Sequence, residues 1–471
     1  MEKKKEVKET SEKKKKSIKQ VIKDIIKPSH MVIDFGSDSI KIVYGHFNNK
    51  VLEVFGHSII PVGRELVDDG KVLNPLEVAS LLQKSIEQND IKVADVTLVL
   101  SGSDIVIREI QIPKVDEKEV GKIIEFEAQQ YFPIELTEYM TDYKILDEVN
   151  VDNEERLRIL LVAVPLEQIR DYIKVAECLG VHLKSIDLLI NTTLKYFLGN
   201  NYMKEFRKEE DGAVPEFSFS SLFTMDLTTS MKSLNKYLRE RINSLKSKNE
   251  EEDEQLEEGK EPGKLGKIKL KLKEARVKII SKLKKKVKEA EDHGVEQEKG
   301  AIYALLDMGA KTTSIYIYSD HRLRFNRTLL TGGDELDKEI SKEMTLSEED
   351  AKNLKLTRGN LVTNENESQL FEDSENFNKA LTLAFGNIMN DTSRFLEFYN
   401  SRSTEGSIKK IYIYGGASKL RGAKEYMTDF FNIPVEYLEN GHYKVSYTGA
   451  NKDDYELNKR SLVNVIGGLI K

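Results

Sequence analysis

Apolar residues are sparse before residue 30 and then alternate with polar ones, which is the pattern of β-strands. The segments MVIDFG, SIKIVYGHF and VLEVFGHSII follow one another between residues 31 and 60 and predict a meander of three strands. Residues 75–89 place apolar side chains at helical spacing, and the apolar run DVTLVLSG comes after them. Strands and a helix in this order predict an α/β domain.

The chain continues with a predicted helix and then with further strands. The segment after Pro113, EKEVGKIIEFEAQQYF, has helical periodicity, and Pro133 ends it. The segments YKILDEV and LRILLVAVP predict strands, and a helix closed by Gly180 follows them. From Gly300 the strand pattern resumes with AIYALLDMG and TTSIYIY. Because both halves open with a strand, Asp-x-Gly and a second strand, we predict a duplicated architecture.

Two strongly charged stretches lie outside these halves. Residues 1–29 are rich in Lys and predict a basic tail, in which Ser17 to Lys27 have the spacing of a short amphipathic helix. Residues 201–299 predict an insertion or linker, with an acidic block at 250–261 and a basic amphipathic segment at 264–288. Each amphipathic segment fits peripheral contact with a membrane or a partner, and it equally fits docking on the protein itself. The sequence leaves both interpretations open.

The composition describes a soluble protein of more than one domain. The chain has 471 residues, of which 39% are hydrophobic and 32% are charged. Its net charge of -7 favours no uniform nucleic-acid-binding surface, so we expect no nucleic-acid partner. Cys178 is the one cysteine, which excludes an intramolecular disulfide and suits a reducing compartment. Since the sequence has neither a long apolar run nor a secretory signal, we predict a cytoplasmic protein.

The turn between the first two predicted strands carries groups suited to phosphate and metal. Gly36 lets backbone N–H groups approach an anion, and Ser37 and Ser39 can donate hydroxyl hydrogen bonds. Lys41 supplies a positive charge for phosphate, and Asp34 would face a hydrated Mg²⁺. An ordinary hairpin turn has a similar composition, so this turn alone does not decide the function.

A turn of the same type opens the second half. Asp307 ends the first strand there and would face the same Mg²⁺ through water. The candidate phosphate-binding residues of this turn are Gly309, Lys311, Thr312 and Thr313. Two such turns from opposite halves can hold the phosphates and the metal of a nucleotide between them.

Two glycine-containing turns complete the candidate site. Gly332 and Gly333 follow the antiparallel strands of the second half and could line the nucleotide, although a simple turn also accounts for them. A short apolar strand runs into the other turn, which consists of Gly415, Gly416 and Ala417. Glycine at the end of a strand lets the backbone approach a flat base.

The order of these turns resembles the actin-like ATPase superfamily. Within it, residues 123–146, 160–165 and 177–188 resemble the PilM family, which are cytoplasmic actin-like proteins of type IV pilus assembly. The closing segment NVIGGLI also fits this family.

The resemblance implies an actin-like (ribonuclease H-like) α/β fold with duplicated domains at 30–200 and 300–471 and with ATP and Mg²⁺ between them. It implies inserted subdomains at about 113–155 and about 331–385. It further implies an adaptor at the inner face of the cytoplasmic membrane that works with other pilus assembly components. Such an adaptor binds the cytoplasmic N-terminal segment of a PilN-like inner-membrane protein beside the first subdomain.

One position departs from the family pattern, and no catalytic residue is assigned. Family members often carry an acidic residue that meets the ribose, where this chain has Lys352 after Ala351. Ser101, Ser103 and Asp104 lack a distinctive spacing for orienting water, so we predict ATP binding with slow hydrolysis at most. Two alternatives remain, a membrane-tethered cell-division protein resembling FtsA and a small-molecule kinase with a catalytic Asp in its cleft.

Overall fold

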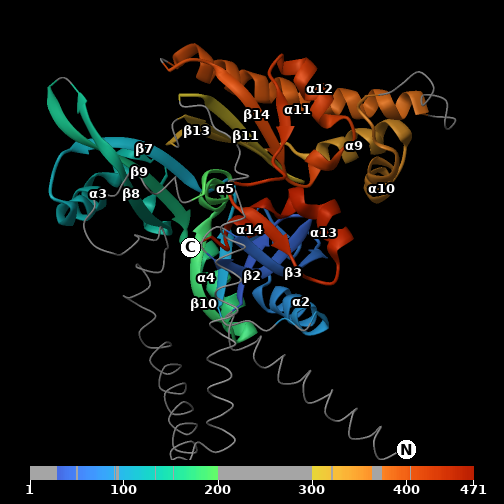
Figure 1. Cartoon of the computed structure of the whole chain (residues 1–471), viewed down its shortest axis with the longest axis horizontal. Helices are drawn as coiled ribbons and strands as arrows, with labels where there is room; N and C mark the ends of the chain where they lie inside the picture. Colours follow the sequence, from blue (N-terminus) through green and yellow to red (C-terminus); the bar gives the residue numbers. More distant parts are fainter. Residues whose placement is uncertain are drawn as a thin grey trace, which may run out of the picture. The chain divides into compact units, whose positions relative to one another are not determined.

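The computed structural model describes ten stretches of the chain (Figure 1). They are residues 29–48, 51–89, 91, 95–132, 134–151, 153–199, 300–319, 322–362, 374–403 and 405–470. The predictions of a basic tail before residue 29, of its amphipathic segment and of the charged insertion at 201–299 lie outside these residues. Within the described residues, no helix is long and apolar enough to cross a membrane.

The first half is built on a six-stranded sheet with the order β10-β6-β1-β2-β3-β16. Its strands are β1 (His30–Phe35), β2 (Ser39–Asn48), β3 (Val51–Pro61), β6 (Asp95–Leu100), β10 (His182–Leu188) and β16 (Lys444–Tyr447). The first three strands are antiparallel, as the alternating pattern predicts, and β6 and β10 continue the sheet in parallel. The edge strand β16 comes from the C-terminal part of the chain and pairs in parallel with β3.

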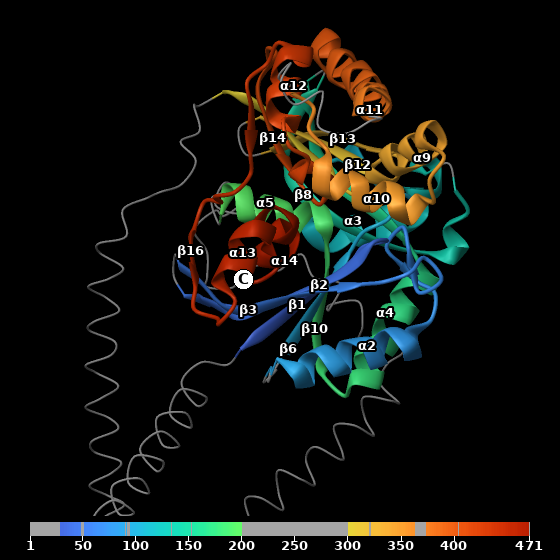
Figure 2. The same cartoon turned by 90° about the vertical axis from the view of Figure 1, so that its right-hand side faces the viewer.

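Helices cover both faces of this sheet (Figure 2). They are α2 (Pro75–Gln88), α4 (Leu166–Leu179), α5 (Leu189–Leu198) and α14 (Val463–Gly467). Helices α2 and α4 pack against each other on one face, and α5 and α14 pack against each other on the opposite face. Since both faces are covered, the central strands are apolar at successive positions, and Val32, Ile33 and Val43 are completely buried.

The second half repeats this arrangement in a five-stranded sheet with the order β13-β12-β11-β14-β15. Its strands are β11 (Ile302–Met308), β12 (Thr313–Ser319), β13 (Arg322–Leu329), β14 (Ile408–Tyr414) and β15 (Val435–Tyr437). As with β1, β2 and β6, strand β11 lies between an antiparallel neighbour, β12, and a parallel neighbour, β14. The predicted duplicated α/β fold is therefore confirmed.

Four longer helices belong to the second half. They are α9 (Gly333–Met344), α10 (Glu348–Arg358), α11 (Ser374–Arg402) and α12 (Ala423–Phe431). On α11, Phe377, Leu381, Phe385 and Met389 follow one another at intervals of four residues and are buried. This spacing keeps the apolar side chains on one face of the helix, where they join the core that strands β11, β12 and β14 also form.

A separate three-stranded sheet, with the order β7-β9-β8, projects from the first half. Its elements are β7 (Val106–Pro113), α3 (Glu117–Tyr131), the turn of 3₁₀ helix η1 (Leu136–Glu138), β8 (Tyr139–Val151) and β9 (Glu154–Pro165). Ile112, Ile124 and Ile159 share its own small core. The sheet extends beyond the predicted limits of 113–155 at both ends, because Val106 pairs with Ala163 across β7 and β9. We call residues 106–165 the small subdomain.

One carboxylate of the small subdomain lowers its stability at neutral pH. Burial raises the pKa of Asp142 on β8 to about 6, and the hydrogen bond from the Tyr143 N–H opposes that shift. A raised pKa in the folded state means that the stabilising protonated form is lost as the pH rises through about 6. We expect Asp142→Asn, which keeps the acceptor, to raise the free energy of unfolding at neutral pH by about 1–3 kcal/mol.

Chemical denaturation at several pH values checks this prediction. The gain from Asp142→Asn should shrink as the pH falls towards the ordinary carboxyl pKa of 3.8, because the wild-type side chain is then neutral as well. Glu148→Gln is the control, since Glu148 lies on the same strand with its side chain 54% exposed and should change stability little. Equal effects of the two substitutions would contradict the prediction.

Candidate functional site

A cavity of about 780 Å³ lies where the β1–β2 turn of the first half faces the β11–β12 turn of the second. Most of the predicted site residues line it, namely Asp34, Gly36, Ser37, Ser39, Lys41, Asp307, Gly309, Lys311, Thr312, Gly333, Gly415, Gly416 and Ala417. Thr313 and Gly332 are not among its lining residues. The fold thus brings together groups that are separated by several hundred residues in the sequence.

The β1–β2 turn places a carboxylate beside an ammonium group. The register pairs Asp34 directly with Lys41, and their side chains lie 3.4 Å apart. The turn closes with a hydrogen bond from the Gly36 N–H to the Ser39 carbonyl at 3.2 Å. A Cβ on Gly36 would lie 2.9 Å from that carbonyl oxygen and 3.0 Å from Lys41 Nζ, so glycine keeps the turn close to the lysine.

The β11–β12 turn repeats this geometry with a second carboxylate. The Gly309 N–H donates to the Thr312 carbonyl at 2.9 Å, as Gly36 does in the first turn. Asp307 is half-buried, and its loss of hydration raises its pKa to about 6, with a smaller contribution from the negative charge of Asp34. Asn464 opposes the shift by donating to Asp307 Oδ2 at 3.1 Å.

Two facing carboxylates, one of them poorly hydrated, fit a divalent cation that they contact through water. Asp34 and Asp307 are the residues that would hold it. The cation would supply positive charge for phosphate oxygens and would relieve the repulsion between the two side chains. Lys41 already supplies one positive charge beside Asp34.

Thr313 and Gly332 have structural roles instead of lining the cavity. Thr313 is buried, and its hydroxyl donates to the Thr331 carbonyl at 2.8 Å, which ties the start of β12 to the turn before α9. A Cβ on Gly332 would lie 2.5 Å from the Ala310 carbonyl oxygen, so glycine is needed for close packing of the two turns. Gly333, which does line the cavity, donates its N–H to the Gly309 carbonyl at 3.0 Å.

The turn after β14 forms a third wall of the cavity. Gly415 has φ +90°, a conformation that favours glycine. A Cβ there would lie 2.5 Å from Asp307 Oδ1, so this glycine also makes room for the carboxylate. Gly416 has open space around its Cα, and Ser418 steadies the turn by donating to the Gly415 carbonyl at 2.7 Å.

Several cavity residues were not identified from the sequence. Lys355 on α10 donates to the Gly333 carbonyl at 2.8 Å and pairs with buried Asp337 at 2.7 Å, which joins α9 to α10 beside the cavity. Lys419 follows the β14 turn, and burial and then the nearby Lys41 lower its pKa. Asn464 could have been identified from the sequence, because it is a polar residue inside an otherwise apolar segment.

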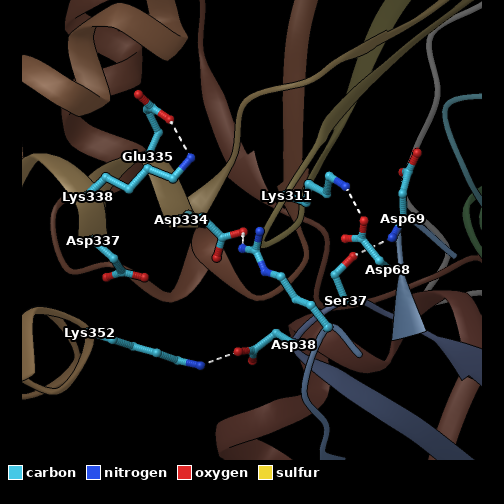
Figure 3. A network of polar contacts seen from close by, with 12 residues as sticks. Ser37, Asp38, Asp68, Asp69, Lys311, Asp334, Glu335, Asp337, Lys338 and Lys352 are labelled. Carbon is cyan, nitrogen blue, oxygen red and sulfur yellow. Dashed lines mark hydrogen bonds and ion pairs between the residues drawn. The ribbon is translucent and has the colours of Figure 1, made fainter. Parts of the chain in front are cut away.

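Ion pairs cross the cavity from one half to the other (Figure 3). Lys352, at the position where the family often has an acid, points toward Asp38 of the first turn and pairs with it. At the other side of the view, Lys311 pairs with Asp68 at 2.6 Å. Arg64 pairs with Asp334 between them. These contacts join the two halves around the cavity.

The residues considered for orienting a water molecule fall into two groups. Ser101 and Ser103 line the cavity, and the Ser103 N–H donates to Asp69 Oδ2 at 3.1 Å. Asp104 is not among the lining residues and pairs with Lys71. The geometry assigns the role of a catalytic base to none of the three.

Comparisons with known proteins follow the two halves of the chain. The family model described as Type IV pilus assembly protein PilM matches residues 32–196, and the one described as Cell division protein FtsA matches residues 304–460. The fold and the two family models together show an actin-like fold that is similar to these two families. The first half is similar to PilM of type IV pilus assembly, and the second half is similar to FtsA. The predicted resemblance is confirmed.

One solved structure supports the same fold. A PilM-PilN type IV pilus biogenesis complex is 16% identical, with a TM-score of 0.62, and the match covers 94% of this chain and 98% of that chain. Looser matches are the ethanolamine utilization protein EutJ from Carboxydothermus hydrogenoformans (10% identity, TM-score 0.43, 94% and 90% covered) and MreB5 of Spiroplasma citri bound to ADP (11%, 0.41, 94% and 95%). No curated protein sequence matches the chain.

Proposed function

We propose that the chain is an ATP-binding adaptor of type IV pilus assembly. In this proposal Mg·ATP occupies the cavity between the β1–β2 and β11–β12 turns, and the protein binds the cytoplasmic N-terminal segment of a PilN-like membrane protein. The protein then acts at the inner face of the cytoplasmic membrane together with other pilus assembly components. One observation carries the proposal: the two matching turns, each with an aspartate and a lysine, face each other across one cavity.

The cavity also offers a place for an extended peptide. Beyond the turns, its walls include Ile105 to Arg108 at the start of β7 and Asn326 to Thr328 on β13. In the part of the chain that the structure describes, β7 pairs only with β9 and β13 pairs only with β12. Each strand therefore keeps one edge whose backbone groups can pair with an added strand. We call this part of the cavity the strand groove.

The side chains of the strand groove define the kind of segment that fits. Ile107, Leu189 and Ile190 supply apolar surface, and Arg108 and Arg327 add positive charge at exposed positions of the two strands. An extended segment with alternating apolar side chains and some acidic residues matches both features. Because the groove and the nucleotide cavity share walls, nucleotide binding can change the affinity for the segment.

The test is recovery of the partner by the purified full chain from solubilised membranes, with and without Mg·ATP. We expect recovery of a pilus protein with one membrane span through its cytoplasmic tail, and a difference between the two conditions. Ile107→Asp should reduce recovery at least about tenfold, because it places a charge on the apolar wall.

Phe126→Asp is the matched control for this prediction. Phe126 lies on α3 of the same small subdomain, is 86% exposed and is not among the cavity residues. Its substitution should leave recovery unchanged. Loss of recovery with Phe126→Asp and normal recovery with Ile107→Asp would place the partner on α3 and overturn the strand groove. Far-UV circular dichroism of both variants shows whether the fold is kept.

The FtsA-like match favours a second interpretation, a cell-division protein tethered to the membrane by its C-terminal helix. In this chain, the side chains from Val463 to Ile466 on α14 are buried. Helix α14 packs against α5, and Asn464 reaches the cavity. These residues serve the fold and the site. The PilM model over residues 32–196 and the similarity to a PilM-PilN complex favour the pilus adaptor, which remains our proposal.

A further inference from the structure

A short hairpin beside the cavity carries a carboxylate that binds the lysine of the second turn. The hairpin consists of β4 (Val67–Asp68) and β5 (Lys71–Val72), joined by Asp69 and Gly70 with φ values of +51° and +74°. Asp68 Oδ2 lies 2.6 Å from Lys311 Nζ, whereas the other carboxylate oxygen, Oδ1, is buried and has no hydrogen-bond partner among the residues that the structure describes.

Three hydrogen bonds to two neighbouring elements, the β1–β2 turn and α4, hold this hairpin in place. The Asp69 N–H donates to Ser37 Oγ of the first turn at 2.9 Å. The Gly70 carbonyl accepts from Gln168 Nε2 at 3.0 Å and from the Tyr172 hydroxyl at 2.7 Å, both on α4. The hairpin thus presents Asp68 to Lys311 from a fixed position beside both turns.

The two ends of the cavity differ in chemistry. At one end Gly333, Lys355 and Ala417 lie together, since a Cβ on Gly333 would lie 3.4 Å from the Ala417 Cβ and Lys355 donates to the Gly333 carbonyl. This wall is suited to the base and sugar. Figure 3 shows Lys352 and Asp337 on one side of the view, and Ser37, Lys311, Asp68 and Asp69 on the opposite side. Asp337 pairs with Lys355 at 2.7 Å, so the first side is the one that Lys355 belongs to. A nucleotide with its base at the Ala417 wall would extend its phosphates along the cavity, whose lining includes Lys311.

We propose that Asp68 takes the place of a terminal phosphate at Lys311 and thereby sets the preference of the cleft between nucleoside diphosphates and triphosphates. This inference rests on the proposed nucleotide binding. A triphosphate reaches Lys311 and must displace the Asp68 carboxylate, whereas a diphosphate is shorter and leaves the pair intact. Asp68 therefore weakens triphosphate binding selectively, because a carboxylate and a phosphate compete for one ammonium group.

The experiment measures the affinities of the full chain for Mg·ADP and Mg·ATP by titration calorimetry. Asp68→Asn removes the competing charge, so we expect the ratio of ATP affinity to ADP affinity to rise about tenfold. Lys311→Met removes the shared cation, and the ratio should then fall below that of the wild type. The two substitutions change the ratio in opposite directions, which general damage to the fold would not do.

Asp38→Asn is the matched control. This substitution removes the carboxylate that pairs with Lys352 across the same cavity. It should change the affinities for ADP and ATP by a similar factor, so their ratio should stay the same. An unchanged ratio in Asp68→Asn, with both nucleotides still bound, overturns this inference and leaves nucleotide binding intact. If the wild type binds neither nucleotide, both the proposed ATP-binding function and the inference about Asp68 fail.

Discussion

Replacing Asp34 or Asp307 by alanine should weaken Mg·ATP binding about ten- to hundredfold while the fold remains. Each carboxylate ends a central strand and faces the cavity, so its loss removes a charged contact to the hydrated metal and leaves a space that water can fill. Lys41 loses its partner in Asp34→Ala, but its side chain keeps access to the cavity.

Titration calorimetry with Mg·ATP measures this effect. Thermal unfolding adds a second readout, because a ligand that binds only the native state raises the melting temperature as its concentration increases. Asp391→Ala is the control, since Asp391 is on α11 outside the cavity and its side chain is 42% exposed. Two results would exclude this cleft as the nucleotide site: wild-type affinity for Mg·ATP in both cavity variants, or a melting temperature that does not change with the concentration of Mg·ATP.

Gly415→Ala should destabilise the chain by about 2–5 kcal/mol and abolish nucleotide binding. The residue has φ +90°, and the new Cβ would lie 2.5 Å from Asp307 Oδ1 and 2.6 Å from the Met308 carbonyl oxygen. Neither atom can move freely, because Met308 belongs to β11 and Asp307 is hydrogen-bonded to Asn464. The change therefore pushes the turn after β14 away from the end of β11 and the β11–β12 turn.

Gly300→Ala is the control that shows the cost of a positive φ without the contact that Gly415→Ala makes with Asp307. Gly300 has a similar φ of +78°, but a Cβ there meets nothing within 4 Å in the described part of the chain. Its substitution should cost only about 1–2 kcal/mol and leave nucleotide binding normal. Chemical denaturation and calorimetry on both variants provide the comparison, and equal losses at the two positions would show that contact with Asp307 is unimportant.

Much of this fold could be predicted because strands and turns depend on the residues within each short segment. The alternation that predicts β1 to β3 and the repeated Asp-x-Gly turns identified both halves. The individual cavity residues remain predictions of function, although the fold brings most of them to one cavity. Gly332 shows the limit of the pattern, since a glycine required for packing looks the same in the sequence as one that lines a ligand site.

The features that the sequence did not reveal depend on contacts between distant segments. Lys352 pairs with Asp38 more than three hundred residues away, and no local periodicity reports such a pair. Asn464 is held in the same way, because its Oδ1 accepts from Thr193 of the first half at 2.8 Å while its amide donates to Asp307 of the second. Long-range polar contacts of this kind define the site, and only the folded chain shows them.

The pairing of β16 with β3 has a consequence for how the protein is made. The ribosome synthesises Met31 of β1 hundreds of residues before Lys444, the first residue of β16. The first sheet nevertheless needs β16 as its edge strand. The first sheet therefore stays incomplete throughout synthesis, with the edge of β3 open to wrong partners. Because pairing between distant segments slows folding, we expect the first sheet to be completed late and its open edge to favour aggregation until then. A chain truncated before β16 would contain the other five strands of the first sheet but would lack the edge strand that covers β3.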